Sequence, residues 1–314
     1  MRLDAAIEEF VQYKRALGNL YIGSANILKA FLRQTGNLEL NALTNLHCEA
    51  FLPQKGDTAT NMWFQRYAVL DRFFRYAAGR GYMYHRVLPT TFPERPPQFV
   101  PYIYSTGDIR RLLGVPDSHY PRNCPMSPDT MRTLILMLYA TGMRLGEACR
   151  LTYADADLKN ATLTVRETKF DKSRLVPIGK DLATLLRLYR FRHRPGIGYQ
   201  RPPTVLAVKI GMMIQNYHAD HQYQWLRREA GVLRFDSARY QPRLHDFRHT
   251  FAVTRLLTWY REGKDVQRML PFLSTYLGHV CVEETSVYLR MTHELLQEAS
   301  RCFERYAFPE VHNG

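Results

Sequence analysis

The chain has 314 residues, with 43 Lys or Arg against 29 Asp or Glu, so its formal net charge is +14. Its content of 46% hydrophobic and 12% aromatic residues excludes fibrous, collagen-like and mainly disordered proteins. The length favours two domains, and an isoelectric point near 9.6 favours a polyanionic partner, most commonly nucleic acid. The competing interpretation is a protein that is basic without having such a partner.

Signals for membrane insertion or export are missing from the sequence. No run of about 18 apolar residues is present, so no transmembrane helix is expected. The first residues, MRLDAAIEEF, include acids where a signal peptide needs its apolar stretch. We expect a cytoplasmic, nucleoid-associated protein with no membrane partner. No C-x-x-C pair occurs among Cys48, Cys124, Cys149, Cys281 and Cys302, so a zinc ribbon is not expected. In that reducing compartment the cysteines are expected to be free thiols.

The first 88 residues predict a small helical domain. Apolar residues recur at helical spacing in its first two segments, Thr44 is a good N-cap residue for the third, and Gly79 and Gly81 supply a stop signal for the fourth. The expected helices cover 3–17, 24–34, 44–53 and about 58–78. This domain contains 11 basic and 7 acidic residues, so both halves of the chain are basic.

A proline-rich segment at 89–104 is predicted to be an extended linker, because proline at this density prevents helix formation. A second domain is expected over 105–314. It begins with a helix near Ser105, and its strands are predicted from alternating β-branched residues that form a hairpin. The expected strands cover 161–168 and 174–178, and the further helices cover 131–140, 181–192, 218–230 and 246–262.

Two segments of the second domain are suited to binding a phosphate. A glycine turn at Gly142 opens a helix whose first turn carries Arg144, and Glu147 lies on the same face. Arginine offers a planar fork of donors that matches phosphate oxygens. Further along, His245 and Arg248 are three residues apart and share a helical face, so a phosphate there would meet a guanidinium and a proton-handling imidazole.

Simpler interpretations exist for each segment taken alone. The arginine–glutamate pair could be a surface salt bridge, and the histidine could be a capped, partly buried side chain. A His-Asp pair is also typical of metal phosphohydrolases, but further His and Asp ligands at compatible spacing are missing. Two more segments add weight to the functional interpretation: a Leu-Gly-His sequence ending at His279, and Tyr288 nine residues later.

In this order, the segments resemble the tyrosine recombinase, or phage integrase, family. Its catalytic pattern is an arginine after a T-G turn, a hairpin lysine, H-x-x-R, L-G-H and a tyrosine nine residues beyond. The resemblance covers about 105–314, and the helical segment before it is similar, more loosely, to the family's core-binding domain. The matching residues are Arg144, Lys169, His245, Arg248, His279 and Tyr288, with Glu147, Lys172 and His249 as supporting residues.

The resemblance implies a mainly α fold with a small β-sheet or hairpin. Residues 1–88 would form a SAM-like, DNA-binding core-binding domain, and 105–314 an α+β catalytic domain. Two departures stand out. The stretch between the second arginine and the L-G-H segment is long, so the extra residues around Trp259–Pro271 are expected to form a helix extension or a loop beside the site. The hairpin offers two lysines, of which Lys169 matches the family position better than Lys172.

The residue types also imply a mechanism. Tyr288 would attack a phosphorus atom of DNA, and Arg144 and Arg248 would stabilise the charge on the nonbridging oxygens. A free tyrosine has a pKa of about 10, so a base is needed to take its proton at neutral pH. His245 would be that base. Lys169 would give a proton to the departing 5′ oxygen. Arginine and lysine then supply the electrostatics, so no cofactor or metal is expected.

The expected function is a site-specific DNA recombinase, an integrase or transposase, that works through a 3′-phosphotyrosine intermediate, and a mobile element is the expected source. His279 would hold the phosphate. The family implies a homo-tetramer on two double-stranded DNA sites, with the helix at 291–306 docked on a neighbouring protomer or on its own domain. The alternatives are a type IB topoisomerase-like enzyme and a catalytically silent DNA-binding accessory protein.

Overall fold

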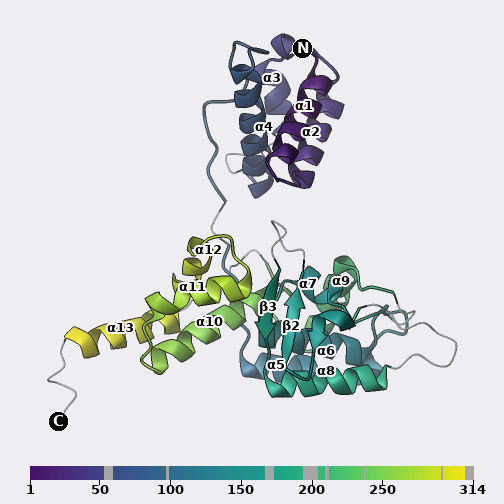
Figure 1. Ribbon diagram of the computed structural model, residues 1–314, viewed down its shortest axis with the longest axis vertical. Helices are drawn as coiled ribbons and strands as arrows, with labels where there is room; N and C mark the ends of the chain where they lie inside the picture. The colour runs from purple at the N-terminus through teal and green to yellow at the C-terminus, as the bar shows by residue number, and fades with distance from the viewer. Residues whose placement is uncertain are drawn as a thin grey trace. The chain divides into compact units, whose positions relative to one another are not determined.

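The chain folds into two compact units, Met1–Gln98 and Phe99–Gly314, in the computed structural model (Figure 1). The division falls inside the predicted linker. The assignment of functional domains to 1–88 and 105–314 stays a prediction. The structure describes residues 1–52, 59–96, 99–166, 173–193, 204–208, 212–236, 238, 240–290 and 293–307, and for 290, 293 and 302–307 the backbone alone.

The first unit is helical, as predicted. Its helices pack their apolar faces around Phe10, Leu28 and Phe73, each at most 1% exposed. The last helix starts after Thr60, whose side chain accepts a hydrogen bond from the backbone N of Trp63. The elements are α1 (Leu3–Ala16), α2 (Ile22–Thr35), the 3-10 turn η1 (Leu40–Ala42), α3 (Asn45–Phe51) and α4 (Asn61–Gly79).

The proline-rich segment is held by side chains on either side of the division between the units. In the first unit, the ring of Phe92 lies against Tyr67 and Trp63 of α4, with centroids 4.8 and 6.1 Å apart. In the second unit, the backbone N of Tyr104 donates to Oγ1 of Thr250 at 2.9 Å.

The second unit is mainly helical with one small antiparallel sheet, which confirms the predicted fold class. The predicted hairpin strands pair with Leu163 opposite Val176, and a two-residue strand precedes them, too short to be seen in an alternation pattern. The strands are β1 (Ala156–Asp157), β2 (Thr162–Val165) and β3 (Arg174–Pro177), in the order β1-β2-β3. The helices are α5 (Thr106–Gly114), α6 (Pro128–Thr141), α7 (Leu145–Arg150), α8 (Lys180–Arg192), α9 (Asn216–Glu229), α10 (Asp246–Arg261), α11 (Val266–Leu277), α12 (Glu283–Ser286) and α13 (His293–Ala307), with the 3-10 turns η2 (Asp117–His119), η3 (Tyr153–Asp155) and η4 (Val287–Arg290).

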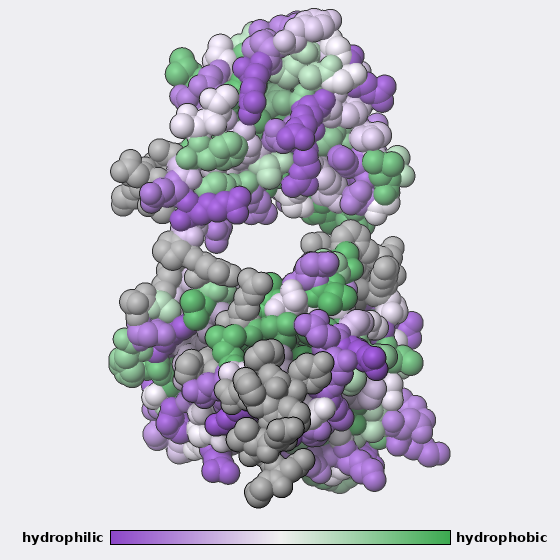
Figure 2. Space-filling model, turned by 90° about the vertical axis from the view of Figure 1, so that its left-hand side faces the viewer, coloured by the Kyte–Doolittle hydropathy of each residue, from purple (hydrophilic) through white to green (hydrophobic). Residues whose placement is uncertain are grey.

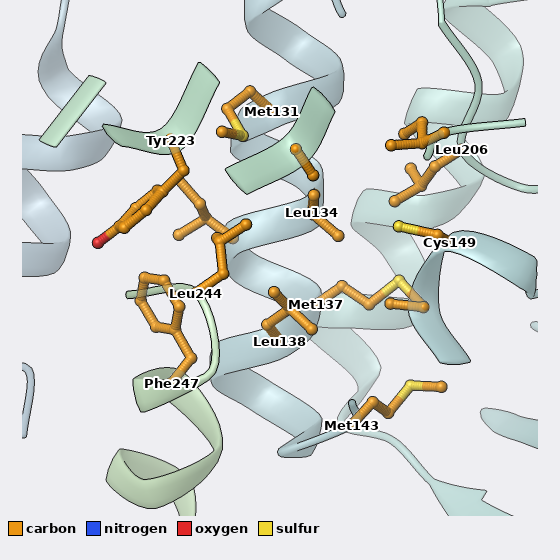
Figure 3. Packing of buried hydrophobic residues seen from close by; sticks show 14 of the residues in the cluster. Met131, Leu134, Met137, Leu138, Met143, Cys149, Leu206, Tyr223, Leu244 and Phe247 are labelled. Atoms are coloured by element: carbon orange, nitrogen blue, oxygen red, sulfur yellow. The ribbon is translucent and has the colours of Figure 1, made fainter. Parts of the chain in front are cut away.

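The main apolar core of this unit surrounds α6. Figure 3 shows the side chains of α6 between Tyr223, Leu244 and Phe247 on one side and Cys149 and Leu206 on the other. All five of these side chains are at most 2% exposed. The core therefore fixes the start of α7 and the start of α10, which carry the predicted phosphate-binding residues.

A second apolar cluster joins α10 to α11, η4 and α13. It contains Phe251, Leu256, Leu277, Tyr288 and Leu295, each at most 9% exposed. Figure 1 shows α10, α11 and α12 together on one side of the small sheet, with α13 running away from it. The extra residues 259–271, expected to be a helix extension or a loop, form the end of α10, a turn and the first half of a separate helix, α11.

The surfaces of both units mix hydrophilic and apolar side chains, as Figure 2 shows for the face in view. Within the described ranges, every helix is too short or too polar to cross a lipid bilayer.

Candidate active site

Arg144 and Glu147 form the predicted pair where α6 gives way to α7. The chain leaves α6 through Gly142 in the left-handed conformation, with φ of +62°. Arg144 then donates from Nη1 to Oε1 of Glu147 at 2.9 Å, and its backbone N donates to Oε2 at 3.0 Å. The carboxylate side chain is 3% exposed and the guanidinium side chain 34%. The interpretation as a surface salt bridge is therefore wrong, because the acid is buried.

A second arginine, not predicted as a site residue, shares this carboxylate. Arg174 at the start of β3 donates from Nη2 to Oε2 of Glu147 at 2.7 Å and from Nη1 to Oε1 at 3.1 Å. Burial by itself would raise the pKa of Glu147, but the hydrogen bonds and charge of Arg174, and then those of Arg144, hold it at about 2. Glu147 is therefore ionised at neutral pH.

Arg248, on the first turn of α10, is almost fully buried at 2% exposure. Its Nη1 donates to the carbonyl oxygen of Gly142 at 2.9 Å. Burial, followed by the charge of Arg144, lowers the pKa of Arg248 to about 10. The guanidinium is still positive at neutral pH, and two of its five N–H donors are used by backbone carbonyls.

The C-terminal end of α11 gathers three guanidinium groups, here called the arginine cluster. The last carbonyls of a helix have no partner within the helix and carry partial negative charge, so they attract cations. The carbonyl oxygens of Tyr276, Leu277 and Gly278 accept hydrogen bonds from Arg174, Arg248 and Arg144, in that order, at 2.8, 2.8 and 3.1 Å. One helix end thus positions all three arginines.

Tyr288 lies in η4 and is 4% exposed. Its ring contacts His249 and His279, with centroids 5.6 and 6.0 Å away. Burial raises the pKa of Tyr288, while the charge and hydrogen bonding of Arg248, and then the charge of Arg144, act in the opposite direction. The predicted nucleophile is therefore a buried phenol next to the arginine cluster.

Two histidines, His249 and His279, contact this phenol, and His245 lies against His249. His279 shares a 2.7 Å hydrogen bond between its Nδ1 and Oγ1 of the fully buried Thr285, which fixes the ring. His245 keeps an open side to solvent, and its ring lies 5.1 Å from that of His249. Burial, followed by neighbouring positive side chains, lowers the pKa of His279 to about 3 and that of His249 to about 4. The pKa of His245 is lowered as well, by burial of its closed side and then by His249 and Arg248.

The structure thus brings together the predicted Arg144, His245, Arg248, His279 and Tyr288, and the supporting Glu147 and His249. Both hairpin lysines, Lys169 and Lys172, lie outside the described residues. Arg174 and Thr285 could not be identified from sequence, because one stands in a short strand pattern and the other in a polar stretch without a motif.

Residues 108–294 match the family model described as the phage integrase family. The chain belongs to the phage integrase family. A protein of Sinorhizobium fredii named as an integrase/recombinase, y4rB, shares 35% identity with this family member over 307 residues, which are 96% of each chain. Full-length similarity at this level extends the kinship to the first unit as well.

Solved structures share the family fold. An integrase of the transposon Tn1549, in complex with a circular intermediate DNA, has a TM-score of 0.67 and 15% identity, covering 96% of this chain and 99% of that one. A lambda integrase tetramer bound to a Holliday junction has a TM-score of 0.61 and 16% identity, covering 90% of this chain and 79% of that one.

Proposed function

We propose that this phage integrase family member is a site-specific DNA recombinase in which Tyr288 forms the 3′-phosphotyrosine link. The observation that carries the assignment is the position of the buried phenol, in contact with two histidines and beside Arg248 of the arginine cluster. A tyrosine next to fixed positive charge is suited to attack a phosphodiester, whose charge grows during the reaction.

Arg144 and Arg248 would bind the nonbridging oxygens of the scissile phosphate. Their guanidinium groups are already held by backbone carbonyls, so little reorganisation accompanies the reaction. A preorganised donor of this kind is typically worth about 3 kcal/mol of transition-state stabilisation. Arg144 is a third exposed and so remains accessible to DNA.

The phenolic proton would pass to a neutral imidazole. We assign His245 as the base, with His249 between it and Tyr288. Because burial and nearby positive side chains lower their pKa values, these rings are unprotonated at neutral pH and can accept a proton. The bond from phosphorus to the 5′ oxygen then breaks, and Lys169 would supply the proton that this oxygen needs. His279, fixed by Thr285, would hold the phosphate.

The link between Tyr288 and the 3′ phosphate keeps a phosphodiester bond, so a 5′ hydroxyl of a second duplex can rejoin it without ATP. This requires DNA as partner and more than one protomer. We extend the proposal to a tetramer on two duplexes, with residues 1–88 as a second DNA-binding domain. In the helix at 291–306, Leu295 packs into its own unit, whereas Leu296 is 52% exposed and available to a neighbouring protomer.

The test is a covalent adduct on denaturing gels, formed with nicked duplexes that carry the DNA flanking the gene. Wild type and the control variant Tyr217→Phe, a tyrosine that is 66% exposed, should form the adduct. Tyr288→Phe should bind DNA normally and form none. An adduct in Tyr288→Phe would overturn the assignment. An adduct without strand exchange between two duplexes would indicate the topoisomerase, and DNA binding without any adduct would indicate the accessory protein.

A further inference from the structure

We infer that Arg174 is a positioning residue, which keeps Arg144 ready for phosphate by taking up the charge of Glu147. This inference rests on the proposed function, because it concerns the same site. Arg174 is 10% exposed and Glu147 3%, so both are shielded from DNA and solvent by the fold. Arg144, at 34%, is the more open partner of the same carboxylate.

The charges explain why a second arginine is needed. Glu147 alone beside Arg144 would make a neutral pair, and the carboxylate would compete with a DNA phosphate for the same guanidinium. Arg174 contributes two hydrogen bonds, at 2.7 and 3.1 Å, to both oxygens of that carboxylate. With Arg174 in place the three groups carry a net charge of +1, and Glu147 orients Arg144 without cancelling its charge.

The geometry fits arginine and excludes lysine. While both Nη atoms of Arg174 contact Glu147, its Nε donates to the carbonyl oxygen of Tyr276 at 2.8 Å. Three fixed donors in one plane are a property of a guanidinium, and an ammonium cannot reproduce them. Gly278 provides the space, because a Cβ there would lie 2.7 Å from Nη1 of Arg174. The guanidinium is therefore clamped between α7 and the end of α11.

The position of Arg174 in the sheet offers one rival explanation. Arg174 pairs with Val165 at the first register position of β3, next to the segment that contains Lys169. Its replacement could therefore act through the lysine instead of through Arg144. A second rival is a purely structural ion pair that only stabilises the unit. Chemically altered substrates separate these explanations. A neutral phosphate analogue removes the need for the charge of Arg144, and a sulfur leaving atom removes the need for the proton from Lys169.

The experiment compares Arg174→Gln, Arg174→Lys and the double variant Glu147→Gln/Arg174→Gln in single-turnover cleavage. Arg166→Gln is the matched control, since Arg166 also lies in the sheet region and pairs with a different acid, Asp155. Three nicked duplexes are used: an ordinary phosphate, a neutral methylphosphonate at the scissile position, and a phosphate whose leaving oxygen is sulfur. Thermal melting of each variant is recorded in parallel.

We expect both single variants to slow cleavage of the ordinary phosphate about 10–100-fold, less than loss of a direct donor. The deficit should shrink to about threefold on the methylphosphonate, which carries no charge that Arg144 must balance. On the sulfur substrate, the deficit of each single variant relative to wild type should be as large as on the ordinary phosphate. The double variant should cleave no more slowly than Arg174→Gln. Arg166→Gln should match wild type throughout.

Three results would overturn the inference: wild-type cleavage by Arg174→Gln, recovery on the sulfur substrate alone, or a lower melting temperature with no recovery on either altered substrate. A second measurement needs no cleavage and therefore stands apart from the proposed function. Inorganic sulfate should raise the melting temperature of wild type and Arg166→Gln, and should do so far less for Arg174→Gln. Equal stabilisation of all three would contradict the role of Arg174, whereas failure of wild type to cleave any duplex would contradict the proposed function.

Discussion

Gly142 occupies a turn in which two separate effects oppose any other residue. Its φ of +62° lies in the left-handed region, which costs an L-residue about 1–2 kcal/mol. A Cβ there would also lie 2.6 Å from Cδ1 of Phe251 and 3.0 Å from Cδ2 of Leu277. The Phe251 ring is 9% exposed and stacks on Tyr276, so it has little room to move. Overpacking of this kind costs about 1–3 kcal/mol. Gly142→Ala should therefore destabilise the second unit by about 2–5 kcal/mol.

Gly231→Ala is the matched control for this change. Gly231 has the same φ of +62°, but a Cβ added there meets no atom within 4 Å. Gly231→Ala should therefore destabilise the second unit only by the cost of placing alanine in the left-handed conformation, about 1–2 kcal/mol. The difference between the two variants measures the contact with Phe251 and Leu277 by itself.

Urea unfolding followed by tryptophan fluorescence measures both losses. In a Trp63→Phe background the signal comes from Trp225 and Trp259, which both belong to the second unit. Gly142→Ala should also slow cleavage, because the Gly142 carbonyl holds Nη1 of Arg248. Equal destabilisation by the two alanine variants would refute the steric argument. A loss of stability below about 1 kcal/mol for Gly142→Ala would refute both the backbone and the steric effect.

Two further predictions concern charged groups of the site. The Glu147 carboxyl, with a pKa of about 2 instead of 4.5, contributes about 3 kcal/mol that is fully present above pH 4.5 and is lost as the pH falls through about 2. Glu147→Gln should therefore be less stable than wild type at pH 7. Its free energy of unfolding in urea should also fall less steeply than that of wild type as the pH is lowered from 4.5 to about 2. An equally steep fall in both proteins would contradict the lowered pKa. Lys169→Ala should regain cleavage on a substrate whose leaving oxygen is sulfur, because a thiolate leaves without a proton. Rescue of Lys172→Ala instead, measured in the same assay, would show that the wrong lysine was chosen.

Local signals in the sequence predicted the elements well. Thr44 stands at the N-cap of α3, and Ser105 caps the predicted first helix of the second unit, where its side chain accepts a hydrogen bond from the backbone N of Asp108. The pair of Arg144 and Glu147 was also predictable, although Arg144 stands at the N-cap of α7 and not on its first turn, because the N-cap residue and the residue three positions later are neighbours at any helix start. These features depend on contacts within a few residues, which the order of the sequence determines directly.

Long-range contacts of the site could not be predicted in the same way. Arg174 meets Glu147 across 27 positions and the Tyr276 carbonyl across 102, and these contacts depend on how β3 packs against α11. A charged residue in a short strand pattern is expected to face solvent, yet its side chain is 10% exposed. The gathering of Arg248 and Tyr288 was expected from the family resemblance and from no local signal.

The two apolar clusters of the second unit hold different parts of the site. The main core around α6 anchors the start of α7, and with it Arg144. Tyr288 belongs to the smaller cluster of α10, α11 and α13. Parts of a folded protein can open locally, each with its own free energy. Because the Gly278 carbonyl at the end of α11 also holds Arg144, opening of the smaller cluster would release Tyr288 and one support of Arg144 together, while the core around α6 stays folded.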